Sequence, residues 1–578
     1  MTNDTLASGV FRRRSTFVLA LTFLLSLPAL WAGMMGDDYM HYAVLNAKNL
    51  PIGKPDDLSL FGLFSFINGD PERNRQAMDL GVLPWWTYGG MKYAFWRPVS
   101  EAFHWLDHQL WPRMPGLMHL HSILWYLALC VLLTRLYRKT LGAGIVALLA
   151  LALYALDSTH GFTISWIANR NALISTLFGL LSLWFYLRWR EEDRLGFVAL
   201  SLLCLLTSLL SAELGISSYG YLGAYALTLD KKGKLKGCLA TLPHLTVIII
   251  WWLIYKQAGF GATNADAYYI DPAAQPLGFL SVVAERLPVL LASQWGIIPA
   301  EIYGFVLEHD VRFVVGCVIF LLLVGVPAVM ACRQVVAVRF WLLGMLFSLL
   351  PAATALPHDR VLLFAGAGAA PVLAHLLRAT LPKGAKIAGL PIAYTRPVAF
   401  LLVFVHLILS PLLYPLMIYS TKLWAGLIPQ EPSRFADLEP VEHKRLVIFG
   451  APLPSALAIA PFRFYREESI PERIWVISTL RGPYDLIATA DNQLQIDLPT
   501  GFIQEAESKV RDLSRYPFHE GDQVDLSGMT ITVSRLNDDG KPTRLTLTFD
   551  RSLQDETLQF IRWDNKSKAY EVLTPHTP

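Results

Sequence analysis

Two adjacent carboxylates, Asp37 and Asp38, stand directly after the first apolar run of the chain, which covers residues 17–35. Three arginines, at residues 12–14, precede that run. Because basic residues before a first membrane span usually stay in the cytoplasm, both carboxylates are expected to emerge on the outer face. At that place a carboxylate can act as a general base, or can hold a cation or an acceptor hydroxyl. The alternative is an ordinary polar end of a membrane helix.

Three arginines are also expected on the outer face, in loops between apolar runs: Arg97, Arg170 and Arg360. Arginine there runs against the usual charge bias of membrane proteins, and its guanidinium fork matches the oxygens of a phosphate group. These side chains are therefore candidates for binding phosphate at the level of the lipid headgroups. The alternative is salt bridging within the protein. Arg360 would then pair with Asp359, and Arg97 would pair with one of its acidic neighbours, Glu101 and Asp107.

Four further ionisable side chains lie in turns between apolar runs: His160, Glu213, His358 and Asp359. Charge near the membrane interior is costly, so each is expected to have a partner or a function. Glu213 either faces the outer water or lines a cavity, and His160 shares the loop 157–171 with Arg170. No spacing of Cys and His residues indicates a metal site, and a divalent cation stays open as a cofactor.

The composition places these residues in a membrane protein. Charged residues make up 16% of the 578 positions, against about 25% in soluble domains, and 54% are hydrophobic. The mean hydropathy is +0.40. A net charge of +3, without a basic cluster that contains aromatic residues, argues against a nucleic-acid partner.

Apolar runs alternate with short loops, and the loops assigned to the inner side are rich in Lys and Arg. This pattern predicts about eleven membrane helices, with the N-terminus inside and the C-terminus outside. Two long loops, 36–116 and 256–310, fall on the outer side, and the second contains an apolar piece at 290–295 that is predicted to be re-entrant. The predicted spans are 17–35, 117–133, 145–156, 172–187, 197–210, 214–229, 239–255, 311–331, 340–356, 361–377 and 398–419.

The first long loop contains tryptophans beside polar residues, at 83–86, 94–98 and 103–107. Tryptophan is favourable at the headgroup level, so these pieces are predicted to be helices that lie along the outer interface.

The composition changes after residue 430. Short runs of alternating polarity, bounded by Gly, Pro, Asp or Asn, predict β-strands. They occupy residues 445–449, 473–477, 493–497, 529–533 and 545–549. The chain is therefore divided into a membrane domain, 1–430, and a mostly β domain outside the membrane, 431–578, in which no catalytic constellation is visible.

Taken together, these stretches resemble the GT-C glycosyltransferases, polytopic membrane enzymes that use polyprenyl-phosphate sugars. Gly36-Asp37-Asp38-Tyr39 fits the acidic motif of their first outer loop. The pattern is most similar to the transmembrane-and-TPR protein O-mannosyltransferases and their bacterial relatives. Their motifs are matched by Trp96-Arg97-Pro98-Val99, by His160 with residues 167–173, by residues 210–216, and by Asp359-Arg360-Val361-Leu362-Leu363. Ala212 and Asn171 depart from that pattern, and a β domain stands in place of TPR repeats.

The resemblance implies an α-helical GT-C-like fold and an inverting sugar transfer at the outer face. Asp38, assisted by Asp37, would be the catalytic base, and Arg360, Arg170 and Arg97 would offset the charge on the leaving lipid phosphate. His160, Glu213, His358 and Asp359 complete the expected substrate-binding set. The expected partners are a polyprenyl-phosphate sugar donor, membrane lipids and an acceptor that is a glycan, a lipid or a protein.

Other classes remain open from the sequence. One is a different membrane glycopolymer enzyme, such as a ligase or a polymerase. A transporter would show repeats and broken helices near the membrane centre, which the sequence lacks. The third class is a non-catalytic membrane scaffold that displays the β domain. The expected location is a bacterial inner membrane, with the β domain in the periplasm.

Overall fold

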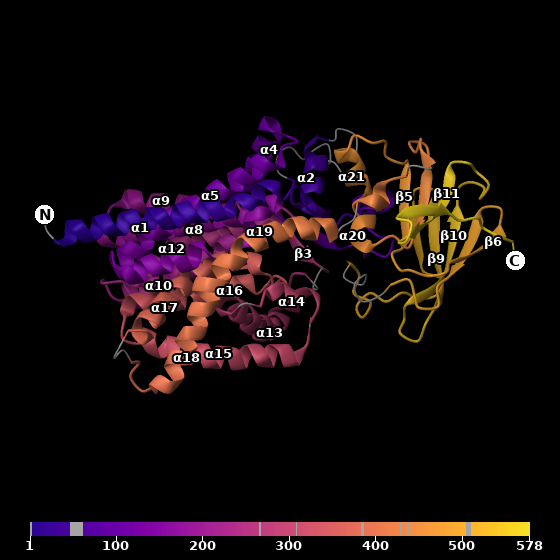
Figure 1. Cartoon of the computed structure of the whole chain (residues 1–578). Coiled ribbons are helices and arrows are strands. Elements are labelled where there is room, and N and C mark those ends of the chain that lie inside the picture. The colour runs from indigo at the N-terminus through magenta and orange to yellow at the C-terminus, as the bar shows by residue number, and fades with distance from the viewer. Residues whose placement is uncertain are drawn as a thin grey trace. The chain divides into compact units, whose positions relative to one another are not determined.

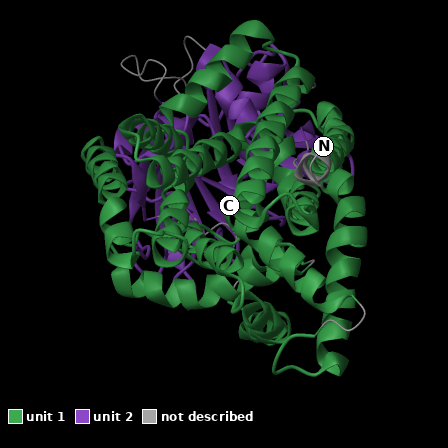
Figure 2. Cartoon of the chain, turned by 90° about the vertical axis from the view of Figure 1, so that its left-hand side faces the viewer, with its two compact units in different colours: residues 1–34, 96–258, 269–423 green, residues 35–95, 259–268, 424–578 purple. Residues whose placement is uncertain are grey.

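The computed structural model describes residues 3–46, 62–264, 268–296, 298–307, 309–382, 386–427, 430–435, 438–503 and 510–577; Figure 1 shows its elements. Part of each predicted long outer loop, including residues 47–61 and 265–267, lies outside this description. The chain forms two compact units (Figure 2). Unit 1 comprises Met1–Met34, Trp96–Ala258 and Tyr269–Leu423, and unit 2 comprises Met35–Phe95, Gly259–Tyr268 and Trp424–Pro578.

Unit 1 is helical. Its longer elements are α1 (Asn3–Ser26), α4 (Pro98–Leu110), α5 (Pro115–Leu141), α6 (Ile145–Ala155), α8 (Arg170–Glu192), α9 (Leu195–Leu209), α10 (Ser217–Thr228), α12 (Leu242–Gln257), α13 (Pro276–Trp295), α15 (Val311–Cys332), α16 (Val336–Ala352), α17 (Leu363–Thr380), α18 (Ile392–Val403) and α19 (Ser410–Leu427). Shorter pieces are η1 (Leu27–Trp31), η2 (Ser158–His160), α7 (Gly161–Ser165), η3 (Ile167–Asn169), η4 (Glu213–Ile216), α11 (Lys234–Ala240), α14 (Ala300–Phe305), η5 (Asp359–Val361) and the π-helical η6 (Phe404–Leu409).

The protein is a multi-pass integral membrane protein. Within the described residues, nine helical segments are long and apolar enough to cross a membrane, and α9 and α16 are shorter apolar helices. All the predicted spans except 214–229 fall on these segments. That one falls on η4 and on α10, a helix of 12 residues and therefore about 18 Å long.

Ion pairs bring three basic loops to the same end of unit 1. Lys139 pairs with Glu191 at 2.5 Å, and Arg190 Nε lies 2.8 Å from Asp230 Oδ2. Lys232 also pairs with Asp193. The loops that follow α5, α8 and α10 thus share one end, as the distribution of basic residues predicts.

Helix α13 replaces the short re-entrant piece predicted around 290–295. The helix has 20 residues. It lies in segment 270–304, both ends of which contact the connection between α16 and α17. Ile270 N donates to Thr354 O at 2.9 Å, while a Cβ placed on Gly304 would lie 2.7 Å from Pro357 O. Both ends of segment 270–304 therefore meet the connection between α16 and α17, and the helix is longer than the predicted re-entrant piece.

The described residues of unit 2 form three sheets and four α-helices: α2 (Asp37–Asn46), α3 (Pro71–Asp79), α20 (Leu453–Ala456) and α21 (Ile459–Tyr465). They also include the short 3-10 helix η7 (Glu431–Ser433). The first sheet is antiparallel and consists of β1 (Ser65–Asn68), β2 (Lys92–Ala94) and β3 (Gly261–Thr263). The second has the order β12-β11-β4-β5, from β12 (Ala569–Val572), β11 (Leu558–Asp564), β4 (Arg445–Phe449) and β5 (Arg473–Ser478). In it β4 pairs in parallel with both β5 and β11.

The third sheet is antiparallel, in the order β6-β7-β10-β9-β8. Its strands are β6 (Asp485–Ala490), β7 (Gln493–Asp497), β10 (Pro542–Phe549), β9 (Met529–Leu536) and β8 (Gln523–Leu526). The five predicted strand segments correspond to β4, β5, β7, β9 and β10. The alternating burial of β7, β9 and β10 is the pattern on which that prediction was based.

Two sequence-based expectations differ from the structure. Unit 2 does not consist only of the C-terminal part, because residues 35–95 and 259–268 also belong to it. In addition, Trp85 and Trp86 do not form an interfacial helix. They are 2% and 0% exposed in the core of unit 2, and Trp85 Nε1 donates to Ile477 O at 3.0 Å. A tryptophan beside polar groups is as compatible with a protein core as with a membrane surface when its N–H has a partner.

Candidate functional site

Arg360 lies in η5, the turn between α16 and α17, and its guanidinium carbon is 5.3 Å from the ring centroid of Trp166. The side chain is half-buried. In the described part of the chain, no carboxylate lies within ion-pair distance of its guanidinium group, although Asp359 directly precedes it in the sequence. A guanidinium group over an indole face is held by a cation–π interaction, and its N–H edge stays available to an anion.

Arg170 has a different environment. Its side chain is fully buried and pairs with the carboxylate of Asp107, which is buried as well. Arg170 Nε also donates to Ser122 Oγ at 2.9 Å, and Nη2 donates to Met118 O at 2.6 Å. The same carboxylate lies 2.8 Å from Nδ1 of His121. Arg170 therefore joins α4, α5 and α8, and its donors are committed to protein acceptors.

Arg97 pairs with Glu213, which lies far from it in the sequence. Its Nε and Nη2 donate to Oε2 of Glu213 at 2.9 and 2.7 Å. The pair connects the residue before α4 with η4, and Val99 N donates to Leu210 O at 3.1 Å beside it. Two of the predicted site residues are thus one ion pair that holds two turns together.

Buried Asp359 and half-buried Glu301 form an acidic pair next to Arg360. Asp359 Oδ1 accepts hydrogen bonds from Ser293 Oγ at 2.6 Å and from Ala300 N at 2.9 Å. Glu301 Oε1 accepts from Asp359 N at 3.2 Å. Burial, and then the nearby Glu301 charge, raise the pKa of Asp359 well above its usual range, and burial also raises the pKa of Glu301.

His358 completes this cluster. Its Nδ1 lies 2.7 Å from Glu301 Oε1, and its ring packs 5.0 Å from the ring of Phe162. Burial, together with the charge of Arg360, lowers the pKa of His358 well below its usual value, so the ring is neutral. Because both carboxyl groups favour protonation, the turn at Arg360 carries less negative charge than its residue types suggest.

His160 lies in the interior of unit 1. Its Nδ1 is 2.9 Å from the hydroxyl of Tyr126, and its Nε2 is buried without a hydrogen-bond partner in the described residues. A Cβ placed on Gly366 would lie 3.1 Å from that Nε2. The loop of His160 reaches the Arg360 turn through other residues, namely Phe162 on His358 and Trp166 on Arg360.

Asp37 and Asp38 belong to unit 2, where they begin helix α2 after Gly36 at φ +49°. Asp38 is 2% exposed, and its Oδ2 accepts a hydrogen bond from Met35 N at 2.9 Å. A carboxylate in the first turn also interacts favourably with the helix dipole. Asp37 is half-buried. The predicted site residues therefore fall into two groups, one in each unit.

Sequence reasoning missed several residues of the Arg360 cluster. Trp166 was part of a matched loop, but it was not singled out as a platform for a cation. Glu301 and Ser293 come from the second long loop, in which no motif marks them. Glu301 stands in the first turn of α14, and an acidic residue in an apolar stretch was the available signal. Among the described residues, no group of three or more Cys, His, Asp or Glu side chains could hold a metal ion.

No protein-family model matches the chain, and no curated protein matches it. Among solved structures, the chain is similar to the crystal structure of ArnT from Cupriavidus metallidurans bound to undecaprenyl phosphate. The identity is 12%, the match covers 92% of this chain and 97% of that chain, and the TM-score is 0.37. At that TM-score the likeness carries no argument about activity.

Proposed function

We propose that the protein is a membrane glycosyltransferase of the GT-C type, which moves a sugar from a polyprenyl-phosphate donor to an acceptor at the outer face of a bacterial inner membrane. The observation that carries this proposal is the state of Arg360. Of the three arginines expected to bind phosphate, it is the one whose guanidinium group makes no ion pair within the described residues. The motif pattern in the sequence supports the same enzyme class.

Arg360 binds the phosphate of the donor. Its stack on Trp166 fixes the plane of the guanidinium fork, so less conformational entropy is lost when two phosphate oxygens are bound. Negative charge grows on this phosphate as the sugar leaves, and a fixed cation stabilises that charge. The raised pKa values of Asp359 and Glu301 reduce the repulsion that two carboxylates beside Arg360 would exert.

The carboxylates of α2 act on the acceptor. Asp38 was expected to be the base with Asp37 assisting, but the burial of Asp38 and its bond to Met35 N favour a division of labour. Asp37, which is half-buried, contacts the acceptor hydroxyl and takes its proton as the sugar is transferred with inversion. Asp38 holds the first turn of α2 in place as a positioning residue.

The other predicted site residues support the bound donor from within unit 1. The Arg97–Glu213 and Arg170–Asp107 pairs fix the turns around α4 and α8. His358 packs on Phe162 of the loop that carries Trp166, and His160 connects the same loop to Tyr126. The acceptor, a glycan, a lipid or a protein, meets the extracytoplasmic β unit.

The test measures release of free polyprenyl phosphate by the purified protein, supplied with a panel of polyprenyl-phosphate sugars. Wild type is compared with Arg360→Ala and Asp37→Asn. Arg312→Ala serves as a matched control, because Arg312 is 91% exposed and pairs only with Asp310 among the described residues. Release that is normal in the control and lost in both variants supports the proposal. Equal release by wild type and Arg360→Ala would overturn the phosphate site.

A preparation that releases no phosphate from any donor, and that retains no prenyl lipid on purification, favours the non-catalytic scaffold. Transfer of a preassembled glycan, with no use of single-sugar donors, favours a ligase or polymerase. Either result contradicts the proposed reaction.

A further inference from the structure

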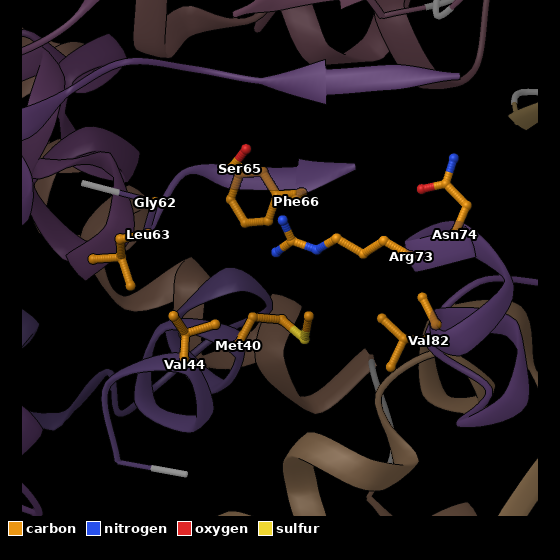
Figure 3. A pocket seen from close by; sticks show the side chains of 10 residues that line it. Met40, Val44, Gly62, Leu63, Ser65, Phe66, Arg73, Asn74 and Val82 are labelled. Carbon is orange, nitrogen blue, oxygen red and sulfur yellow. The ribbon is translucent and has the colours of Figure 1, made fainter. Parts of the chain in front are cut away.

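Unit 2 contains a small pocket between α2, β1 and α3, shown in Figure 3. Met40 and Val44 line it from one face of α2, while Phe66 belongs to β1 and Ala77 to α3. Leu63 and Val82 add further apolar surface. The wall is therefore mostly apolar, which makes the one charged side chain in it worth explaining.

That side chain is Arg73, on α3. Figure 3 shows it extended into the pocket, with its guanidinium group directed toward Phe66. Nη1 is buried and has no hydrogen-bond partner among the described residues, and no carboxylate within them forms an ion pair with Arg73. The nearest acidic influence is Asp70, whose Oδ1 is already bonded to Glu72 N at 3.0 Å.

The neighbouring arginine on the same helix provides a contrast. Arg75 Nε and Nη1 donate to Glu72 at 2.9 Å and to Ser527 at 2.6 Å. A partly buried guanidinium without acceptors is unfavourable, because the N–H groups lose water and gain nothing in return. The polar neighbour Asn74 does not compensate, since its Nδ2 donates to Gly89 O at 2.8 Å.

The size and the lining of the pocket limit what would satisfy Arg73. The cavity offers about 30 Å³ to the centres of water-sized groups, so the space that the atoms of a ligand can fill is larger. The two oxygens of a carboxylate fit this space and match the guanidinium fork, with each oxygen accepting one N–H. A short apolar chain on that carboxylate would contact Met40, Val44 and Phe66.

We propose that this pocket is a binding site for a small carboxylate that carries a short apolar chain, with Arg73 as its anchor. The inference is independent of the proposed glycosyl transfer, since it concerns residues of unit 2 that take no part in that reaction. The pocket shares helix α2 with Asp37 and Asp38, but uses residues further along it.

The test is isothermal titration of the full-length protein in nanodiscs with butyrate, 1-butanol and inorganic phosphate as separate probes. Butyrate is expected to bind and to release heat, whereas butanol and phosphate are not. In Arg73→Gln the affinity for butyrate falls about tenfold or more, the usual effect of losing a charge-assisted hydrogen bond. Arg481→Gln, a change of an exposed arginine in the same unit, leaves the affinity unchanged.

A second variant, Ala77→Leu, fills the pocket while leaving Arg73 in place, and it is also expected to lose butyrate binding. Circular dichroism and thermal unfolding confirm that each variant is folded. Binding of butanol as tight as that of butyrate, binding of phosphate instead of butyrate, or butyrate binding that persists in both pocket variants would each overturn the proposal. So would an equal loss of binding in Arg481→Gln.

Discussion

The guanidinium group of Arg360 lies over the indole ring of Trp166, 5.3 Å from its centroid, and joins the turn before α17 to the loop before α8. Arg170, at the start of α8, is instead enclosed with Asp107. Two arginines that looked equivalent in the sequence therefore differ in what they can do.

Replacing the platform tests the role assigned to Arg360. In Trp166→Leu the cation–π contact is lost, and we expect kcat/KM for the donor to fall about tenfold, since such contacts are worth roughly 1–2 kcal/mol when partly desolvated. Trp166→Phe keeps an aromatic face and is expected to retain most of the activity. Equal loss in both variants would mean that the indole acts in some other way. Steady-state release of polyprenyl phosphate measures the effect.

The buried pair of Arg170 and Asp107 should matter for stability. Asp107→Leu leaves a guanidinium group buried without its carboxylate, which typically costs about 3–5 kcal/mol, so a much lower yield of folded protein is expected. The double variant Asp107→Leu with Arg170→Met removes both charges and should recover part of that stability. Thermal unfolding of the single and double variants checks this. A stable Asp107→Leu protein would contradict the assigned pairing.

The two carboxylates of α2 are expected to affect different properties, Asp37 the turnover and Asp38 the stability. Asp37→Asn is expected to lower turnover by about 10²–10⁴-fold, the usual contribution of a general base, with little change in stability. Asp38→Ala removes the bond to Met35 N and should cost about 1 kcal/mol, the usual net contribution of a hydrogen bond. Asp38→Asn retains a carbonyl oxygen for that bond and should be nearly as stable as wild type. Thermal unfolding and turnover are measured on the same preparations.

The acidic pair at Arg360 predicts a pH dependence of stability. Because the pKa of Asp359 is raised in the folded protein, the folded state binds a proton more tightly than the unfolded state does. The resulting stabilisation is complete below the unfolded pKa of Asp, near 3.9, and is lost as pH rises toward the raised folded value. Asp359→Asn, which stays neutral, should therefore gain in apparent Tm relative to wild type as pH rises from about 5 to about 8. A difference that is constant over this range would argue against the raised pKa.

Burial of Trp85 gives a prediction for unit 2. Trp85→Ala is expected to destabilise the unit by about 3–5 kcal/mol, as large-to-small changes in a core do. Trp85→Phe keeps most of the packing, but loses the hydrogen bond to Ile477 O and should cost less. A tryptophan at the membrane surface would show neither effect on unfolding of the unit, which is followed by near-ultraviolet circular dichroism.

Local periodicity explains why so much of the fold could be predicted. The apolar runs and the alternating strands are properties of neighbouring residues, so α5, α8 and β7 fall close to their expected places. The parallel pairing of β4 with β5 and β11 depends on residues far apart in the chain, and it had no local signal.

The contacts within the candidate site also depend on residues far apart in the chain, so they could not be predicted from the sequence. Charge patterns identified the arginines, but not which carboxylate each one would meet. Arg97 has Glu101 and Asp107 close by in sequence, yet its partner is Glu213, while Asp107 goes to Arg170. Choosing between such partners requires the packing of α4 against α8, which no motif contains.

The segments of unit 2 also set an order for its biogenesis. Residues 35–95 leave the ribosome before β4 and β5, which follow only after residue 424. Phe449 of β4 and Trp475 of β5 pack in one core with Trp85. At about 5–20 residues per second, synthesis of the intervening chain takes on the order of half a minute. During that interval Trp85 and Trp86 are already synthesised, but the strands that will cover them are not. Chaperones would therefore be expected to act on this early segment, and a chain that terminates before β4 would leave it as a target for proteolysis.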